Sequence, residues 1–157
     1  MTMRNPRIDD RDRAILRTLQ ADGRLTNAEL ADRVGLSPSA CLRRVRRLEE
    51  SGLIAGYVML LDPAACGRPG SAFVHIRLES QQRESLDAFE AEVVRVPEVM
   101  ECYLIAGESD YLVRIVYADS ADFERLHAEH LTRLPGVVRI QSTFALREVK
   151  KTTRMPI

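Results

Sequence analysis

Helix start and stop signals follow one another closely between residues 26 and 52, so this part of the chain has room only for short helices. Thr26 with Glu29 three positions later has the pattern of a capping box, and a glycine at position 35 is a typical helix stop. Ser37 and Pro38 then suit the N-cap and first position of a helix predicted over residues 38–51, which a glycine at 52 ends. A further helix, capped by an aspartate at 9 or 10 and ended by a glycine at 23, is predicted before these two.

The helix predicted over residues 38–51 has a basic outer face. At 100° per residue Cys41, Val45 and Leu48 fall on one side, and Ser39, Arg43 and Arg46 lie opposite, with Arg47 beside them. Two short helices joined by a glycine-containing turn, the second basic on its outer face, form the helix-turn-helix arrangement that enters the major groove of DNA. The candidate DNA-contacting residues are Ser37, Pro38, Ser39, Arg43, Arg44, Arg46 and Arg47.

The charge distribution favours a polyanion partner at this end of the chain. The formal net charge is zero, but residues 1–52 hold eleven arginines and eight acidic residues, whereas the remainder holds twelve basic and fifteen acidic residues. On charge alone, a solvated basic helix face is an equally good interpretation. Within the helix-turn-helix hypothesis, Arg43 suits a bidentate contact with guanine, and Arg46 and Arg47 suit phosphate contacts.

The rest of the chain alternates strand and helix patterns. The run LIAGYVMLL at residues 53–61 is predicted as a strand, and AACGRPG at 64–70 as a linker. The order β-α-β-β-α-β that follows is the ferredoxin-like pattern, so an α+β fold is predicted. Its elements are a strand over 71–79, a helix over 83–95, strands over 98–106 and 111–118, a helix over 120–133 and a strand over 137–146.

Both alternating phases of the strand at 111–118 are largely apolar. A sheet with helices on one face needs only one apolar phase, so a second subunit is predicted to cover the other face. The alternative is an open face with scattered exposed apolar side chains.

Four stretches of the chain carry a family resemblance: LTNAELADRVGLSPSACLRRVRRLEESGLIAGY, then GESDYLVRIV, LTRLPGV and REVKKTT. The first resembles the DNA-binding half of the Lrp/AsnC (feast/famine) family of transcription regulators, and the others follow in that family's order, so that the resemblance runs from about Ile8 to Pro156. The resemblance implies a winged helix-turn-helix domain (1–55), a linking strand and linker (56–70) and a ferredoxin-like effector-binding and oligomerisation domain (71–157). It also implies homodimers, commonly assembled into octamers, and a nucleoid-associated protein of the bacterial or archaeal cytoplasm.

The loop GESDY at residues 107–111 has two interpretations. The residues alone indicate a tight hairpin between two strands. The family resemblance adds that such a loop lines an amino-acid effector pocket, where loop N–H groups hold the α-carboxylate and Asp110 holds the α-ammonium group. The candidate effector-binding residues are Gly107, Glu108, Ser109, Asp110, Tyr111, Gln141 and Thr143, the last two from a neighbouring subunit.

Other classes of protein have weaker support in the sequence. An apolar leader or membrane span is not evident, and three cysteines without a CxxC pair fit a reducing cytoplasm. His127 and His130 with Glu124 have metal-ligand spacing but lack an obvious third strong ligand. Nucleophile-elbow and phosphate-loop motifs are absent, so we predict no catalytic residues, no metal and no cofactor.

The predicted function is therefore a sequence-specific DNA-binding transcription regulator that responds to a small amino acid, such as leucine or another apolar one. Two alternatives remain. One is a non-specific architectural DNA-binding protein of the same fold, and the other is a small ferredoxin-like ligand-binding enzyme.

Overall fold

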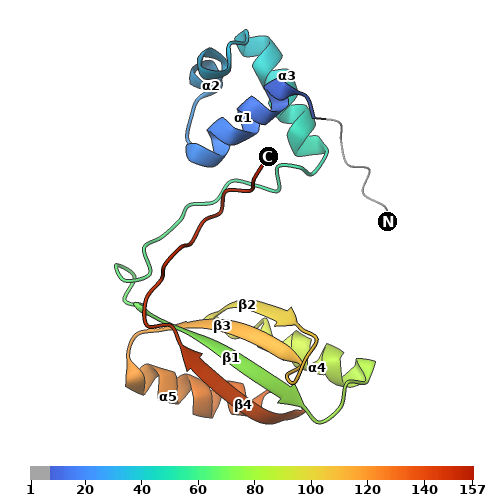
Figure 1. Cartoon of the computed structure of the whole chain (residues 1–157), viewed down its shortest axis with the longest axis vertical. Coiled ribbons are helices and arrows are strands. Elements are labelled where there is room, and N and C mark those ends of the chain that lie inside the picture. Colours follow the sequence, from blue (N-terminus) through green and yellow to red (C-terminus); the bar gives the residue numbers. More distant parts are fainter. Residues whose placement is uncertain (1–7) are drawn as a thin grey trace. The chain divides into compact units, whose positions relative to one another are not determined.

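The computed structural model describes residues 8–157, which divide into two compact units. A helical unit comprises residues 8–59 together with 150–157, and a sheet unit comprises residues 60–149 (Figure 1). No helix within 8–157 is long and apolar enough to cross a bilayer.

The helical unit contains three helices that begin where their caps predict. They are α1 (Asp10–Ala21), α2 (Asn27–Val34) and α3 (Pro38–Glu50). The Thr26–Glu29 capping box forms at the start of α2, and the Ser37 side chain accepts a hydrogen bond from the backbone N–H of Ala40 in α3. Gly35, at the end of α2, has a φ of 64°, a left-handed conformation that favours glycine. The predicted start and stop signals of α2 and α3 are confirmed.

A small apolar core holds the three helices together. Seven side chains from the three helices are at most 7% exposed in it. They are Ile15, Leu16, Leu30, Ala31, Val34, Cys41 and Leu48. The predicted packing position of Cys41 is confirmed, since its side chain is fully buried.

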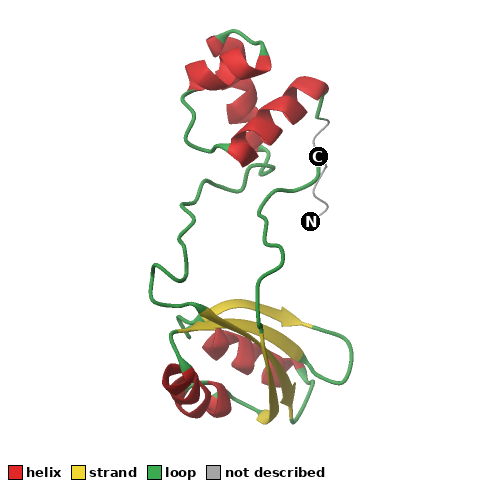
Figure 2. Ribbon diagram, turned by 60° about the vertical axis from the view of Figure 1, so that its left-hand side comes forward, coloured by secondary structure: helices red, strands yellow, loops and turns green. Residues whose placement is uncertain are grey.

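The sheet unit is a four-stranded antiparallel sheet with helices on one face (Figure 2). Its spatial order is β2-β3-β1-β4, with α4 between β1 and β2 in the chain and α5 between β3 and β4. The elements are β1 (Gly70–Leu78), α4 (Arg83–Val93), β2 (Val99–Leu104), β3 (Tyr111–Tyr117), α5 (Ser120–Glu129), a 3₁₀ turn (Leu131–Arg133) and β4 (Val137–Phe144). This confirms the predicted α+β class and the β-α-β-β-α-β order.

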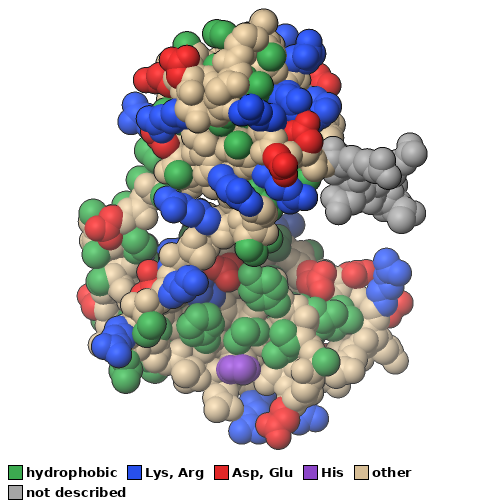
Figure 3. Space-filling view, turned by 45° about the horizontal axis from the view of Figure 1, so that its top comes forward, with side chains coloured by type: hydrophobic (Ala, Val, Ile, Leu, Met, Phe, Trp, Pro, Cys, Tyr) green, Lys and Arg blue, Asp and Glu red, His purple; other side chains and the backbone are tan. Residues whose placement is uncertain are grey.

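Strand alternation separates the two faces of this sheet. On β1, Ala72, Val74 and Ile76 are fully buried in the core that α4 and the 3₁₀ turn also form. The opposite face, here called the open face, carries the alternate residues, among them Phe73 at 38% exposed. Figure 3 shows hydrophobic side chains gathered on the visible face of this unit.

The strand predicted over residues 53–61 is wrong. This segment has no regular secondary structure, and its apolar side chains are exposed, with Val58 at 83% and Met59 at 81%. A strand needs a partner for its backbone N–H and C=O groups. Among residues 8–157 no segment pairs with this run, although its composition alone is β-like.

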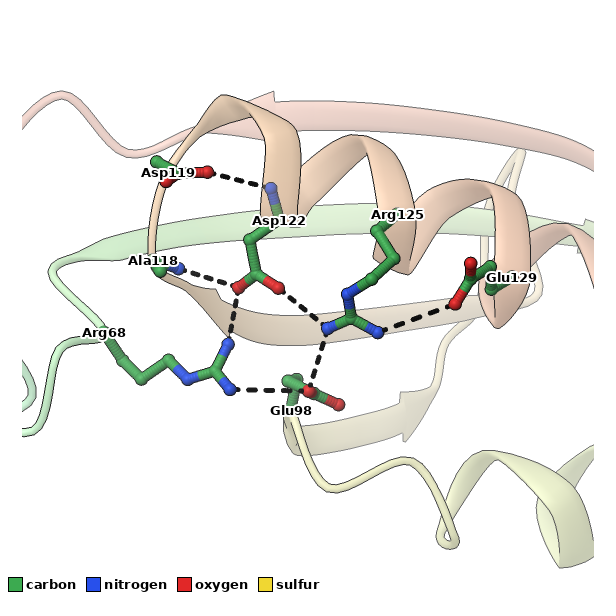
Figure 4. A network of polar contacts seen from close by, with 7 residues as sticks. All are labelled: Arg68, Glu98, Ala118, Asp119, Asp122, Arg125 and Glu129. Carbon is green, nitrogen blue, oxygen red and sulfur yellow. Dashed lines mark hydrogen bonds and ion pairs between the residues drawn. The ribbon is translucent and has the colours of Figure 1, made fainter.

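A network of ion pairs fixes the residues that lead into β1 (Figure 4). Arg68 lies 2.5 Å from Asp122 of α5 and 3.7 Å from Glu98, the residue before β2. Arg125 contacts the same two acids at 2.7 and 3.4 Å. The Asp122 carboxylate also accepts a hydrogen bond from the backbone N–H of Ala118, so the network joins this segment to the start of α5.

The final residues of the chain pack with the helical unit. The Arg17 guanidinium of α1 donates a hydrogen bond to the backbone oxygen of Ile157 at 2.7 Å. The Gln20 side chain and the backbone of Met155 exchange hydrogen bonds in both directions. Residues 150–157 therefore form part of this unit, far in sequence from α1.

Candidate nucleic-acid interface and effector pocket

The start of α3 is fixed by its neighbour α2. The side-chain amide of Asn27, the first residue of α2, donates a hydrogen bond to the backbone oxygen of Pro38 at 2.8 Å. Ser37, Pro38 and Ser39 are exposed at this end, where the helix N-terminus suits a phosphate.

Asp12 of α1 forms ion pairs with two of the four α3 arginines and so leaves the other two without this partner. Its carboxylate is fully buried and pairs with the guanidinium of Arg44 at 2.8 Å and with that of Arg47. Arg44 also contacts Asp9 at 2.7 Å, and these hydrogen bonds, to Asp9 first and then to Asp12, raise the pKa of Arg44. Arg44 therefore joins α3 to α1, and its side chain is only 25% exposed.

Two arginines of α3 are exposed and form no ion pair within residues 8–157. Arg43 and Arg46 make no ion pair with any residue in the range 8–157. Arg47 is intermediate, because one of its guanidinium nitrogens contacts Asp12 while 55% of its side chain is exposed. Figure 3 shows basic side chains on the visible face of this unit.

A shallow groove runs along this side of α3. It is lined by Ser39, Leu42, Arg43, Arg44, Arg46, Arg47 and Glu50. Sequence reasoning did not single out Leu42 or Glu50. Leu42 is 38% exposed, and its position on the flank of the apolar side of the helical wheel was the available signal.

A second hollow, of about 330 Å³, lies on the sheet unit beside the loop that joins β2 and β3. Five predicted effector residues line it: Gly107, Glu108, Ser109, Asp110 and Gln141. Four further residues, His75, Arg77, Gln81 and Arg139, complete the lining. Its volume is at the lower end of the range of small-molecule sites, roughly 300–1,000 Å³.

Two predicted effector residues do not line this pocket. Tyr111 is 1% exposed, stacks on Phe89 with ring centroids 4.3 Å apart, and donates its hydroxyl hydrogen to Glu90 at 2.7 Å. Its side chain therefore belongs to the helix-covered face. Thr143 lies on β4 opposite Phe73, two residues beyond Gln141, and is exposed.

Asp110 is the anchor of the loop. One carboxylate oxygen accepts from the backbone N–H of Leu78 at 2.7 Å, and the other accepts from the side-chain amide of Gln81 at 2.6 Å. Its backbone N–H donates to the oxygen of Ile76, and its backbone oxygen accepts from Ile105. Because this carboxylate is 6% exposed and both its oxygens are engaged, its first role is to shape the hairpin.

The loop contributes exposed groups of its own to the pocket. Gly107 has a φ of 144°, which favours glycine, and allows the chain to turn here. The backbone N–H groups of residues 107–109 donate to no acceptor among residues 8–157, and the Glu108 side chain is exposed. The loop thus presents both N–H donors and a carboxylate.

Sequence reasoning missed His75, Arg77, Gln81 and Arg139. Arg139 shares a strand phase with Gln141, which was the signal that could have identified it. The other three depend on how β1 pairs with β4 and on the course of the turn after β1, which no local pattern gives.

Models of two known domains match the chain. The winged helix-turn-helix DNA-binding model matches residues 8–55, and the Lrp/AsnC ligand-binding domain matches residues 71–155. The chain belongs to the Lrp/AsnC family. It is a transcription regulator with a helix-turn-helix DNA-binding domain and a ligand-binding domain.

Named relatives and solved structures agree with this assignment. The leucine-responsive regulatory protein of Salmonella typhimurium is 42% identical, over 96% of this chain and 92% of its own length. A Neisseria meningitidis transcriptional regulator solved in complex with L-methionine superposes with a TM-score of 0.91 at 39% identity, covering 96% of this chain and 97% of that one. Escherichia coli AsnC, at 23% identity and a TM-score of 0.87, shares the fold.

Proposed function

We propose that this Lrp/AsnC regulator recognises specific DNA through Arg43 of α3, and that Arg46 of the same helix contacts DNA phosphate. The observation that supports this proposal is that the four arginines of α3 differ in their ion pairs. Arg44 and, in part, Arg47 are held by the buried Asp12, whereas Arg43 and Arg46 have no acidic partner within residues 8–157. Guanidinium groups without a partner are the ones free to contact guanine edges or phosphates.

The test measures DNA affinity by fluorescence anisotropy over a range of salt concentrations. It compares DNA from upstream of the protein's own gene with random-sequence DNA. Arg43→Ala is expected to weaken specific binding by about 1–3 kcal/mol and random binding much less, because it loses a base contact. Arg46→Ala is expected to weaken both and to flatten the salt dependence. Arg83→Ala, on the exposed surface of α4, is the matched control.

Three outcomes decide between the candidates. If Arg43→Ala and Arg46→Ala leave both affinities unchanged, α3 does not enter the groove. If the wild type itself binds both DNAs equally, the protein is a non-specific architectural binder. A preference for upstream DNA that depends on Arg43 supports the specific regulator.

The effector that we propose is a free amino acid bound in the pocket beside the loop at 107–110. The unpaired N–H groups of the loop suit its α-carboxylate, and the exposed Glu108 suits its α-ammonium group. Glu108 takes this role in place of Asp110, whose carboxylate is engaged with Leu78 and Gln81. The methionine complex of the Neisseria regulator supports an amino acid as the ligand class.

Self-association also belongs to the proposal. The open face carries the exposed aromatic side chains of Phe73 and Tyr103, and the run at 57–61 is apolar and exposed. Surfaces of this kind suit a second copy of the chain, so we propose a homodimer that assembles further, toward an octamer. Light scattering at micromolar concentration tests it, and a monomeric mass would contradict it.

A further inference from the structure

Four polar residues form a block on the open face of the sheet, on two neighbouring strands. In the antiparallel register of β1 and β4, Arg77 lies directly opposite Arg139, and His75 lies directly opposite Gln141. Residues opposed in this way have Cβ atoms about 5 Å apart, and alternate residues of a strand share a face. The two arginines therefore stand side by side, next to the imidazole and the amide, and all four line the effector pocket.

The charges of this block are not balanced within the chain. Arg77 and Arg139 make no ion pair and no side-chain hydrogen bond with any residue of the range 8–157. Like charges directly opposite each other across two strands are destabilising. Of the two acids that line the pocket, Asp110 is 6% exposed and bonded to Leu78 and Gln81, so only Glu108 remains.

We propose that the Arg77–Arg139 pair binds a second carboxylate, so that the effector is a dicarboxylic amino acid. This rests on the proposed function, in which the loop N–H groups and Glu108 hold the α-carboxylate and the α-ammonium group. One anionic side chain then meets two guanidinium groups, which hydrogen-bond carboxylates in a fixed, often bidentate geometry. The predominantly polar lining also suits such a side chain better than the apolar one expected from the sequence.

The experiment is calorimetry on the full-length protein with L-aspartate and L-glutamate, and with L-asparagine, L-glutamine, L-leucine and L-methionine. We expect a dicarboxylic amino acid to bind at least about tenfold more tightly than its own amide, since it gains charge-assisted hydrogen bonds. Arg139→Gln and Arg77→Gln are expected to abolish this preference for acid over amide while the amide still binds. Arg139→Lys, which keeps the charge, is expected to retain part of the preference, and Arg83→Gln, on α4, all of it.

The outcomes separate this inference from the proposed function. If neutral amino acids bind as tightly as the acidic ones, or if Arg139→Gln and Arg77→Gln keep the acid preference, the inference is overturned and the effector pocket stands. If inorganic phosphate binds as tightly as the acidic amino acids, the pair is a general anion site and the dicarboxylic assignment fails. If no amino acid binds the wild type, the proposed effector function itself fails.

Discussion

Replacing Asp12 with asparagine is expected to destabilise the helical unit more than any exchange on its surface. The Asp12 carboxylate is fully buried, and it accepts hydrogen bonds from Arg44, from Arg47 and from the backbone N–H of Asp9. Asparagine has nearly the same shape but no charge, and it turns an NH₂ group toward one guanidinium. The change therefore removes the charge and one of the two oxygen acceptors that join α1 to α3, without leaving a cavity.

The size of the effect follows from the exposure of the partners. Removing one member of a buried ion pair costs roughly 3–5 kcal/mol. Here the side chains of Arg44 and Arg47 are 25% and 55% exposed, so water recovers part of that loss, and we expect about 2 kcal/mol. A unit of this size loses roughly 4–8 °C of Tm per kcal/mol, so the helical unit should melt about 8–16 °C lower.

The assay combines thermal melts followed by circular dichroism with hydrogen exchange, which assigns the change to α1 and α3. Asp10→Asn is the matched control, an exposed acid in the first turn of the same helix, and should cost less than about 1 kcal/mol. Arg44→Ala combined with Asp12→Asn should cost clearly less than the sum of the two single changes. Additive effects, or a Tm shift no larger than that of the control, would refute the reasoning.

Two further predictions concern other charged groups. The backbone N–H of Asp12, followed by the Arg44 side chain, lowers the pKa of Asp9 from 3.8 to about 2, so its contribution to stability is present above pH 3.8 and is lost as the pH falls toward 2. Acid unfolding curves of Asp9→Asn and wild type should therefore differ above pH 4 and converge near pH 2, and a constant gap would contradict the linkage. Arg68→Ala is expected to cost at most about 1 kcal/mol, since its side chain is 37% exposed, but to speed hydrogen exchange in the segment before β1. Unchanged exchange there would mean that the ion pairs do not hold the segment.

The parts of the fold that depend on neighbouring residues were predictable from the sequence. The Thr26–Glu29 box and the Ser37 cap are local chemistry, and they place the beginnings of α2 and α3 correctly. The loop residues 107–110, predicted as neighbours in one site, do line one pocket, but Gln141 lines it from the same chain, whereas the prediction had it approach from a neighbouring subunit.

The features that the sequence did not predict depend on pairing between residues far apart in the chain. The ion pair between Asp12 and Arg44 spans 32 residues along the chain. Helix spacing alone could not detect it, so Arg44 was predicted to contact DNA in the same way as Arg43. The pairing of Arg77 with Arg139 follows from the register of β1 against β4, with an irregularity just after Arg77. The segment 53–61 has strand composition, but composition cannot provide a strand with a partner.

The return of residues 150–157 to α1 makes the sheet unit an insertion within the helical unit. The chain after β4 ends in the hydrogen bonds of Met155 and Ile157 with α1, and the chain before β1 begins at the segment after α3, so two covalent connections join the units. Since Asp12 of α1 pairs with Arg44 and Arg47, the second connection ends on the helix that holds these two arginines of α3.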